Sequence, residues 1–396
     1  MRDLTPKERI RRTLRFQEVD RVPVFEQEIA DNVAGEILCR KASTGGGGIG
    51  WRRIAEALFR GERSQLVERI GQDLPELTLR LGLDAVNPPL IGTSAADRKI
   101  DENTYYFEDD STSTWAIARY QPETMEYQFV DSSVRREGIP AIERISERLV
   151  DEKPDIDNEE FAVMDLVVDK VGDELGIVGS SVVGIPIEIP WLIASVTRPE
   201  LVSIYLDWQV RYHNELARQY KKHGADFILG GGDLAGRQGP VYSPSTFRSL
   251  VLPRLRRIVE LCHQLGLAYL YRTDGNVWPI AHDLFGETGV DGYGEIDASA
   301  GMRLGELRAK FPKLALWGAV DCARTLVFGS EEEVREETIR NILEGALGGG
   351  YILGSSNTIH PNIPARNFLA MVEAAMEFGI YPINQGLLAA RLGSRS

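Results

Sequence analysis

The most informative part of the sequence is the segment 270–276, Leu-Tyr-Arg-Thr-Asp-Gly-Asn, which holds an arginine and an aspartate two residues apart. The segment follows a short apolar run, which predicts the end of a buried strand and the turn after it. Residues two apart in a strand point to the same side, so Arg272 and Asp274 should share one face. Such a charge pair at a strand end is typical of a site, because strands seldom bury charges without a reason.

Eight apolar runs predict the strands that would position this pair. They cover residues 22–25, 84–87, 176–184, 226–231, 267–271, 290–296, 314–320 and 351–354. From about residue 176 onward, helical patterns separate the runs, as they do in successive βα units. Eight such units predict an α/β fold of the (β/α)8 barrel type. A doubly wound open sheet is the alternative, but no Gly-x-Gly-x-x-Gly follows the first strand.

We expect residues 1–396 to form a single barrel domain with two insertions. Residues 40–80 predict a helical insertion near the N-terminus. In residues 103–137, aromatic residues such as Tyr105, Phe107 and Tyr127 alternate with polar ones, which predicts a β hairpin or small antiparallel sheet.

Polar side chains follow most of the predicted strands, at the end of the barrel where catalytic groups belong. The candidate catalytic acids are Asp233, Asp274 and Glu295. The candidate substrate-binding residues are Arg272, Glu26, Ser181, Asn357 and His360.

Converging carboxylates allow two kinds of chemistry. They can crowd each other until one stays protonated and acts as a general acid. They can also bind a divalent metal, for which His360, Asp274 and Glu295 are the available ligands. Arg272 indicates an anion nearby, either a substrate carboxylate or a carboxylate of the site itself. If Arg272 pairs with Asp274, that aspartate stays ionised and Asp233 or Glu295 must be the acid.

The glycines at 230–232, directly before Asp233, carry no side chains and should let a bulky ligand approach the backbone.

Composition excludes several classes of function. The chain has 45 Lys and Arg against 59 Asp and Glu, a net charge of −14, which argues against nucleic acid as a partner. No uncharged apolar run reaches 18 residues, so we expect no membrane span. The three cysteines lie far apart, which suits a reducing compartment and a cytoplasmic location.

Several short stretches in order resemble the uroporphyrinogen decarboxylase superfamily. They are Leu-Thr-Pro-Lys-Glu-Arg-Ile at 4–10, Asp-Arg-Val-Pro-Val at 20–24, Gly-Ala-Asp-Phe-Ile at 224–228, Tyr-Ser-Pro-Ser-Thr-Phe at 242–247, Thr-Asp-Gly-Asn at 273–276, Gly-Val-Asp-Gly at 289–292, Gly-Gly-Tyr-Ile-Leu at 349–353 and the segment 361–367. The resemblance implies a (β/α)8 barrel. It also implies either a tetrapyrrole decarboxylase or a methyltransferase that works with a corrinoid protein.

The chain departs from both well-defined branches of this superfamily. The decarboxylases carry a Gly-Arg-Tyr motif soon after the first strand, which is absent here, and a histidine at the position of Asn357. The thiol-activating methyltransferases bind zinc through a His-x-Cys pair and a later cysteine, at the positions of Arg272, Asp274 and Asn357. Any zinc would therefore need a different ligand set. What remains resembles the members that act on oxygen substrates such as methyl ethers.

The resemblance thus implies a methyltransferase, an O-demethylase component that passes a methyl group from a small molecule to a corrinoid. The sequence contains no Asp-x-His-x-x-Gly, so the corrinoid should be carried by a partner protein. The substrate is a small molecule, anionic if it binds Arg272 directly, and a homodimer is compatible with this prediction. The alternatives are a tetrapyrrole decarboxylase and a non-catalytic relative that binds an anion through Arg272.

Overall fold

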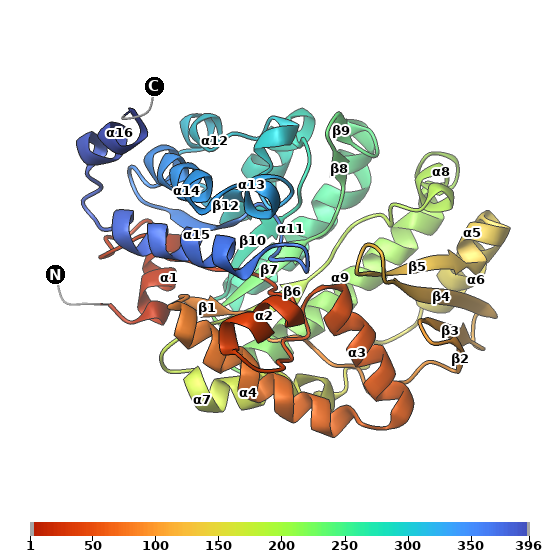
Figure 1. The fold of residues 1–396 in the computed structure, drawn as a ribbon. Coiled ribbons are helices and arrows are strands. Elements are labelled where there is room, and N and C mark those ends of the chain that lie inside the picture. The colour runs from red at the N-terminus through yellow and green to blue at the C-terminus, as the bar shows by residue number, and fades with distance from the viewer. Residues whose placement is uncertain (1–3, 394–396) are drawn as a thin grey trace.

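The structure is a computed structural model that describes residues 4–393, and its centre is a sheet of parallel strands (Figure 1). The sheet has the order β1-β6-β7-β10-β11-β12-β13. These strands are β1 Ala85–Val86, β6 Gly176–Ser181, β7 Phe227–Gly231, β10 Ala268–Arg272, β11 Gly292–Gly294, β12 Ala315–Val320 and β13 Tyr351–Ser355. The predicted fifth strand therefore ends at Arg272, as expected.

Residues 22–25 take the eighth position and close the sheet. On one side, Leu353 N donates to Pro23 O (2.8 Å) and Phe25 N donates to Leu353 O (3.0 Å). On the other side, Asp84 N donates to Val24 O (2.8 Å) just before β1. The extended segment is hydrogen-bonded between the two edge strands, so the predicted (β/α)8 barrel is confirmed.

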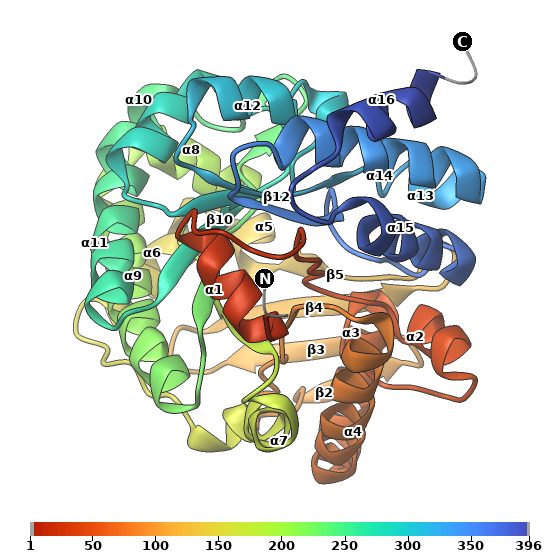
Figure 2. The ribbon, with the colours of Figure 1, turned by 90° about the vertical axis from the view of Figure 1, so that its left-hand side faces the viewer.

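Helices surround the barrel, as Figures 1 and 2 show. They are α1 Pro6–Leu14, α2 Asp31–Leu38, α3 Gly47–Arg60, α4 Arg63–Leu81, α5 Ser133–Glu137, α6 Ile139–Leu149, α7 Ala162–Val171, α8 Ile189–Thr197, α9 Pro199–Lys222, α10 Pro244–Thr246, α11 Leu252–Gln264, α12 Leu304–Lys310, α13 Thr325–Phe328, α14 Glu331–Gly345, α15 Ala365–Phe378 and α16 Gln385–Gly393. Short turns of 3-10 or π helix lie at Asn158–Phe161, Phe247–Val251, Trp278–Ile280, Asp283–Glu287 and Ala298–Ala300. Capping residues set where helices begin. At the start of α14, Ser330 and Glu333 form a capping box.

Both predicted insertions are present. The helices α3 and α4 occupy residues 47–81. The β insertion is a four-stranded antiparallel sheet of β2 Arg98–Asp101, β3 Thr104–Asp109, β4 Thr114–Gln121 and β5 Glu126–Ser132. Tyr105 of β3 donates its hydroxyl to Glu56 of α3, which fixes the small sheet to that helix. A further short hairpin pairs β8 Ala235–Gly236 with β9 Gly239–Pro240.

The interior of the barrel is filled by side chains rather than forming a pore. Phe25, Leu270 and Trp317 are part of this core, and Ile10 of α1 joins them. The Trp317 indole donates to Phe25 O (2.9 Å). Gly294 leaves the space for this ring, because a Cβ there would overlap it. The lumen is therefore packed beneath the ends of the strands.

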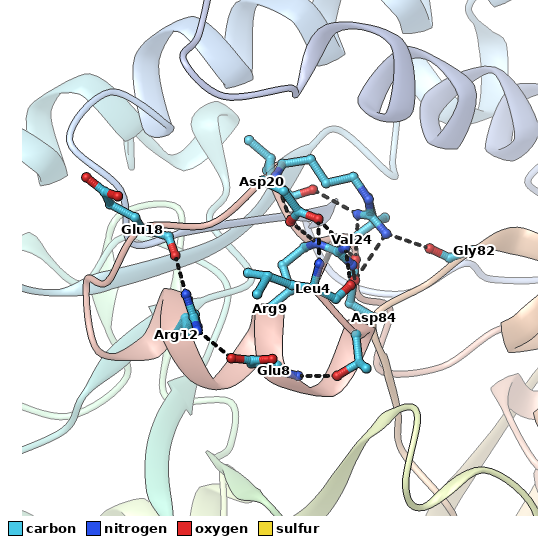
Figure 3. Close-up of polar contacts among 12 residues, drawn as sticks. Leu4, Glu8, Arg9, Arg12, Glu18, Asp20, Val24, Gly82 and Asp84 are labelled. Carbon is cyan, nitrogen blue, oxygen red and sulfur yellow. Dashed lines mark hydrogen bonds and ion pairs between the residues drawn. The ribbon is translucent and has the colours of Figure 1, made fainter. Parts of the chain in front are cut away.

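A buried charge cluster ties α1 to the start of β1 (Figure 3). Asp84, which is fully buried, accepts hydrogen bonds from Arg9, from Arg21 Nη1 (2.7 Å) and from Val24 N (2.8 Å). Arg9 also binds Asp20. In Figure 1, α1 lies at one end of the barrel and the antiparallel sheet at the other, so this cluster serves the fold and stands apart from the strand ends where a site is expected.

Candidate active site at the barrel mouth

A cavity of about 480 Å³ opens at the C-terminal ends of the strands. Its size lies within the range of roughly 300–1,000 Å³ that small-molecule sites occupy. Side chains from the strand ends form one wall, and α3, α9 and the antiparallel sheet form the others. Among the lining residues are Glu26, Gln27, Glu28, Asn87, Ser181, Arg272, Trp51, Leu58, Phe107, Tyr127, His213 and Tyr220.

Arg272 pairs with Glu295, which follows β11. The Arg272 Nη1 atom lies 3.5 Å from Glu295 Oε1, and Gln27 donates its side-chain amide to the same oxygen. The other oxygen, Oε2, is buried without a hydrogen-bond partner in the part of the chain that the structure describes. Of the two anions that the sequence left open for Arg272, the structure therefore supplies a carboxylate of the site itself.

The Glu295 carboxyl can hold a proton near neutral pH. Burial raises its pKa to about 7, Arg272 and Gln27 act in the opposite direction, and Asp274 and Asp233 raise it further. Since Oε1 receives two donors, the proton belongs on the unpartnered Oε2. Glu295 also has a φ of 63°, a left-handed conformation that non-glycine residues adopt mainly where the fold imposes it, often at functional sites.

A chain of hydrogen bonds connects Glu295 to the neighbouring strand ends. Gln27 donates to Asn357 O (2.9 Å) as well as to Glu295. Asn87 in turn donates to Gln27 O (3.1 Å), and Ser180 donates to Asn87 Oδ1 (3.4 Å). Gln27 was missed by the sequence analysis, although its place directly after the first strand was the signal that could have indicated it.

The two aspartates lie near Glu295, as the strand-end rule predicts. The pKa of Asp274 is raised, first by burial and then by Asp233 and Asp297, while a hydrogen bond from Asn357 lowers it. Asp233 is exposed to solvent. The three predicted acids thus influence one another, and Glu295 is the most deeply buried of them.

Glu26 and Ser181 contribute differently to the cavity. Glu26 is buried, and it accepts hydrogen bonds from Ser355 N (2.6 Å) and Ser355 Oγ (2.7 Å). Burial raises the pKa of Glu26 to about 8, against the effect of the Ser355 bonds. The buried Ser181 hydroxyl has no hydrogen-bond partner among residues 4–393, which leaves it available to a ligand.

Replacing Glu26 by glutamine should flatten the dependence of stability on pH. A carboxyl with a raised pKa in the folded state stabilises the fold below its ordinary pKa of 4.5, and this contribution is lost as the pH rises through about 8. Glutamine keeps an acceptor for Ser355 N and has no such titration. Urea denaturation at pH 5 and pH 8 should show a smaller loss of stability for Glu26→Gln than for the wild type. An equal loss in both proteins contradicts the assignment.

His360 is held by the backbone. Its Nε2 atom lies 2.9 Å from Cys322 O, and its Nδ1 atom accepts from Asn362 N (3.4 Å). Both ring nitrogens are thus engaged, so His360 is not placed as a metal ligand with Asp274 and Glu295. No group of three or more His, Cys, Asp or Glu side chains within the described residues is placed to hold a metal ion, so the residues do not fit the metal site that the sequence left open.

Two of the glycines before Asp233, Gly230 and Gly231, lie directly against residues of the neighbouring strand. A Cβ on Gly230 would overlap the Tyr269 hydroxyl, and a Cβ on Gly231 would overlap the carbonyl oxygen of Arg272. Both Tyr269 and Arg272 belong to the adjacent strand β10. For Gly230 and Gly231 the prediction that they admit a ligand is therefore wrong, because they let two strands of the barrel pack closely. A Cβ on Gly232 would instead meet Val182 Cγ1 of the cavity lining at 3.3 Å, so for Gly232 the prediction stays open.

Comparison with known proteins agrees with the motifs in the sequence. Residues 190–378 match the model of the uroporphyrinogen decarboxylase (URO-D) family. This stretch carries most of the strand-end residues described above, and it confirms the resemblance to the uroporphyrinogen decarboxylase superfamily. No curated protein matches the chain.

Two solved structures are similar to this chain, and the first of them shares its fold. A methyltransferase from Methanosarcina mazei is 18% identical, with a TM-score of 0.63 over 95% of this chain and 99% of that one. A putative vitamin-B12 independent methionine synthase from Listeria monocytogenes is 12% identical, with a TM-score of 0.49 over 90% of this chain and 98% of that one. No helix within residues 4–393 is long and apolar enough to cross a membrane.

Proposed function

We propose that the protein is a methyltransferase that transfers a methyl group from an oxygen of a small molecule to a corrinoid carried by a partner protein. The observation that carries this proposal is the Glu295 carboxyl. It is buried, its pKa is raised to about 7, and one of its oxygens lacks a partner within the described chain. The oxygen of an ether needs a proton or a Lewis acid to release its methyl group, and a carboxylic acid in a dry site can supply the proton.

In this mechanism Glu295 acts as the general acid. As the bond between oxygen and methyl breaks, Glu295 Oε2 gives its proton to the departing oxygen, which leaves as an alcohol or phenol. The corrinoid, when bound above the mouth on its partner, supplies the nucleophile that accepts the methyl group. Arg272, 3.5 Å from Oε1, stabilises the carboxylate that remains, and Gln27 keeps the carboxyl in place.

The size of the cavity supports a mechanism in which the methyl donor binds inside the cavity and the corrinoid stays outside it. A volume of about 480 Å³ suits a small methyl donor but not a whole corrinoid. The similarity in fold to a methyltransferase, over 95% of this chain, is consistent with the proposal. Conversely, Arg272 is the one arginine or lysine within residues 4–393 that lines the cavity, whereas a porphyrinogen with many carboxylates would need several such cations.

The function can be tested with the purified protein. Methyl ethers are incubated with free reduced cobalamin, and methylation is followed by the change in visible absorption. Release of carbon dioxide from a porphyrinogen is measured in parallel. Methylation with at least one ether supports the proposal. Carbon dioxide release without methylation overturns it in favour of a decarboxylase, and binding without any reaction favours a non-catalytic relative.

The partner should contact α8, which follows β6 at the mouth. Its residues Ile189, Ile193 and Val196 lie three or four positions apart, and their side chains are 72%, 51% and 76% exposed. Exposed apolar residues on one helical face are typical of a protein interaction surface. This surface stands beside the small antiparallel sheet, away from α1 (Figure 1).

Replacing Ile193 by aspartate should lower methyl transfer to the corrinoid protein about tenfold or more, because a charge would be buried in the contact. Transfer to free cobalamin should stay unchanged. The control is Ile380→Asp, an exposed residue that pairs with Arg21 near the other end of the barrel. Equal rates with the corrinoid protein for Ile193→Asp and wild type would place the partner elsewhere.

A further inference from the structure

The walls of the cavity are suited to a flat, apolar ring. Trp51 and Leu58 of α3 form one side, and Phe107 of β3, Tyr127 of β5 and Tyr220 of α9 contribute further aromatic surface. Aromatic side chains pack well against rings through stacked or edge-on contacts. His213 also lines the cavity, and burial lowers its pKa to about 4, so its ring is neutral at physiological pH.

Carboxyl groups already lie around Arg272 at the polar end of the cavity. Arg272 lies 3.5 Å from Glu295 Oε1, and its positive charge also lowers the pKa of Glu28, which burial raises. Glu28 is fixed in place by a hydrogen bond from Gly47 N (3.2 Å) at the start of α3. Glu26 is occupied by its two bonds to Ser355. Arg272 therefore has two carboxyl groups around it before any ligand arrives.

We propose that this cavity selects an uncharged aryl methyl ether and rejects donors that carry a carboxylate, and that Glu28 enforces the selection. The inference rests on the proposed function and specifies the substrate class of the same site. A carboxylate entering the cavity would have to separate Arg272 from Glu295 or share it with Glu28, which leaves a buried negative charge without a partner. Within the described lining, Glu26 and Glu28 already accept hydrogen bonds from Ser355 and from Gly47 N, so an ammonium group would have to compete with these donors.

Glu28 offers a direct test because glutamine can preserve its shape. Glu28→Gln keeps an oxygen that accepts from Gly47 N but removes the negative charge beside Arg272. The positive charge of the Arg272 guanidinium is then less neutralised and attracts an anionic ligand more strongly. We expect the variant to bind a carboxylated donor about tenfold more tightly than the wild type does, with little change for the uncharged donor.

The experiment is a titration of the full-length protein, without corrinoid, followed by calorimetry or tryptophan fluorescence at pH 7.5. The probes are 1,2-dimethoxybenzene, 3,4-dimethoxybenzoate and 3,4-dimethoxybenzylamine. The proteins are the wild type, Glu28→Gln and the control Glu123→Gln, an exposed residue between β4 and β5. In the wild type and the control, the uncharged ether should bind about tenfold or more tightly than either charged probe.

Each outcome has a defined meaning. Equal or tighter binding of the benzoate or the amine to the wild type overturns the proposal, as does a failure of the uncharged ether to bind. If the ratio of benzoate affinity to ether affinity is unchanged in Glu28→Gln, Glu28 does not enforce the selection. Selective binding of the ether without methyl transfer to cobalamin supports the inference about the cavity while contradicting the proposed function, so the two failures can be told apart.

Discussion

Replacing Glu295 by glutamine should lower the rate of methyl transfer about a hundredfold or more, the usual contribution of a general acid. Glutamine fits the same buried place and can still accept from Arg272 and Gln27, but it has no acidic proton for the departing oxygen. Binding of the methyl donor, measured without corrinoid, should change little. The loss should therefore appear in kcat rather than in the affinity for the donor.

The pH dependence gives an independent check on Glu295. Since its pKa is about 7 and the protonated form is the active one, kcat should fall as the pH rises above about 7. The negative charge of Asp274 raises this pKa, so in Asp274→Asn the fall in kcat should begin at a lower pH than in the wild type. A wild-type rate for Glu295→Gln, or a fall that begins at the wild-type pH in Asp274→Asn, would show that another group supplies the proton.

Much of the fold follows from the sequence because it depends on local patterns. The alternation of apolar runs and helical segments predicts all eight positions of the barrel, and the end of the fifth strand at Arg272 is correct. The aromatic alternation in residues 103–137 also predicts the small antiparallel sheet. Such features are set by residues that are near one another in the chain.

The details of the site could not be predicted in the same way. The strand-end rule brings Asp233, Asp274 and Glu295 to one edge, but it does not say which acid Arg272 contacts. That choice depends on the backbone of Glu295, whose φ of 63° has no signal in the sequence, and on Gln27 from a distant strand end. Gly230 and Gly231 were misjudged because their neighbours, Tyr269 and Arg272, lie on the next strand.

Replacing Asp84 by alanine should destabilise the protein by about 3–5 kcal/mol, which is the usual cost of removing one partner from a buried ion pair. Asp84 is fully buried and accepts from both Arg9 and Arg21, so its loss leaves Arg21 without this carboxylate and Arg9 with Asp20 alone. Its carboxylate also accepts from Val24 N (2.8 Å), while its own N–H donates to Val24 O (2.8 Å). The substitution therefore weakens the contact through which residues 22–25 close the barrel.

The measurement is urea denaturation followed by circular dichroism, with the midpoint and slope compared between variants. Glu306→Ala is the control, because it removes the partner of Lys310 in a pair that is exposed on both sides and should leave the midpoint almost unchanged. If Asp84→Ala does not fold, Asp84→Asn keeps an acceptor for Val24 N and separates the loss of charge from the loss of that hydrogen bond. A midpoint for Asp84→Ala equal to that of the control contradicts the role of the cluster, because removing the buried carboxylate that Arg9 and Arg21 share cannot leave stability unchanged.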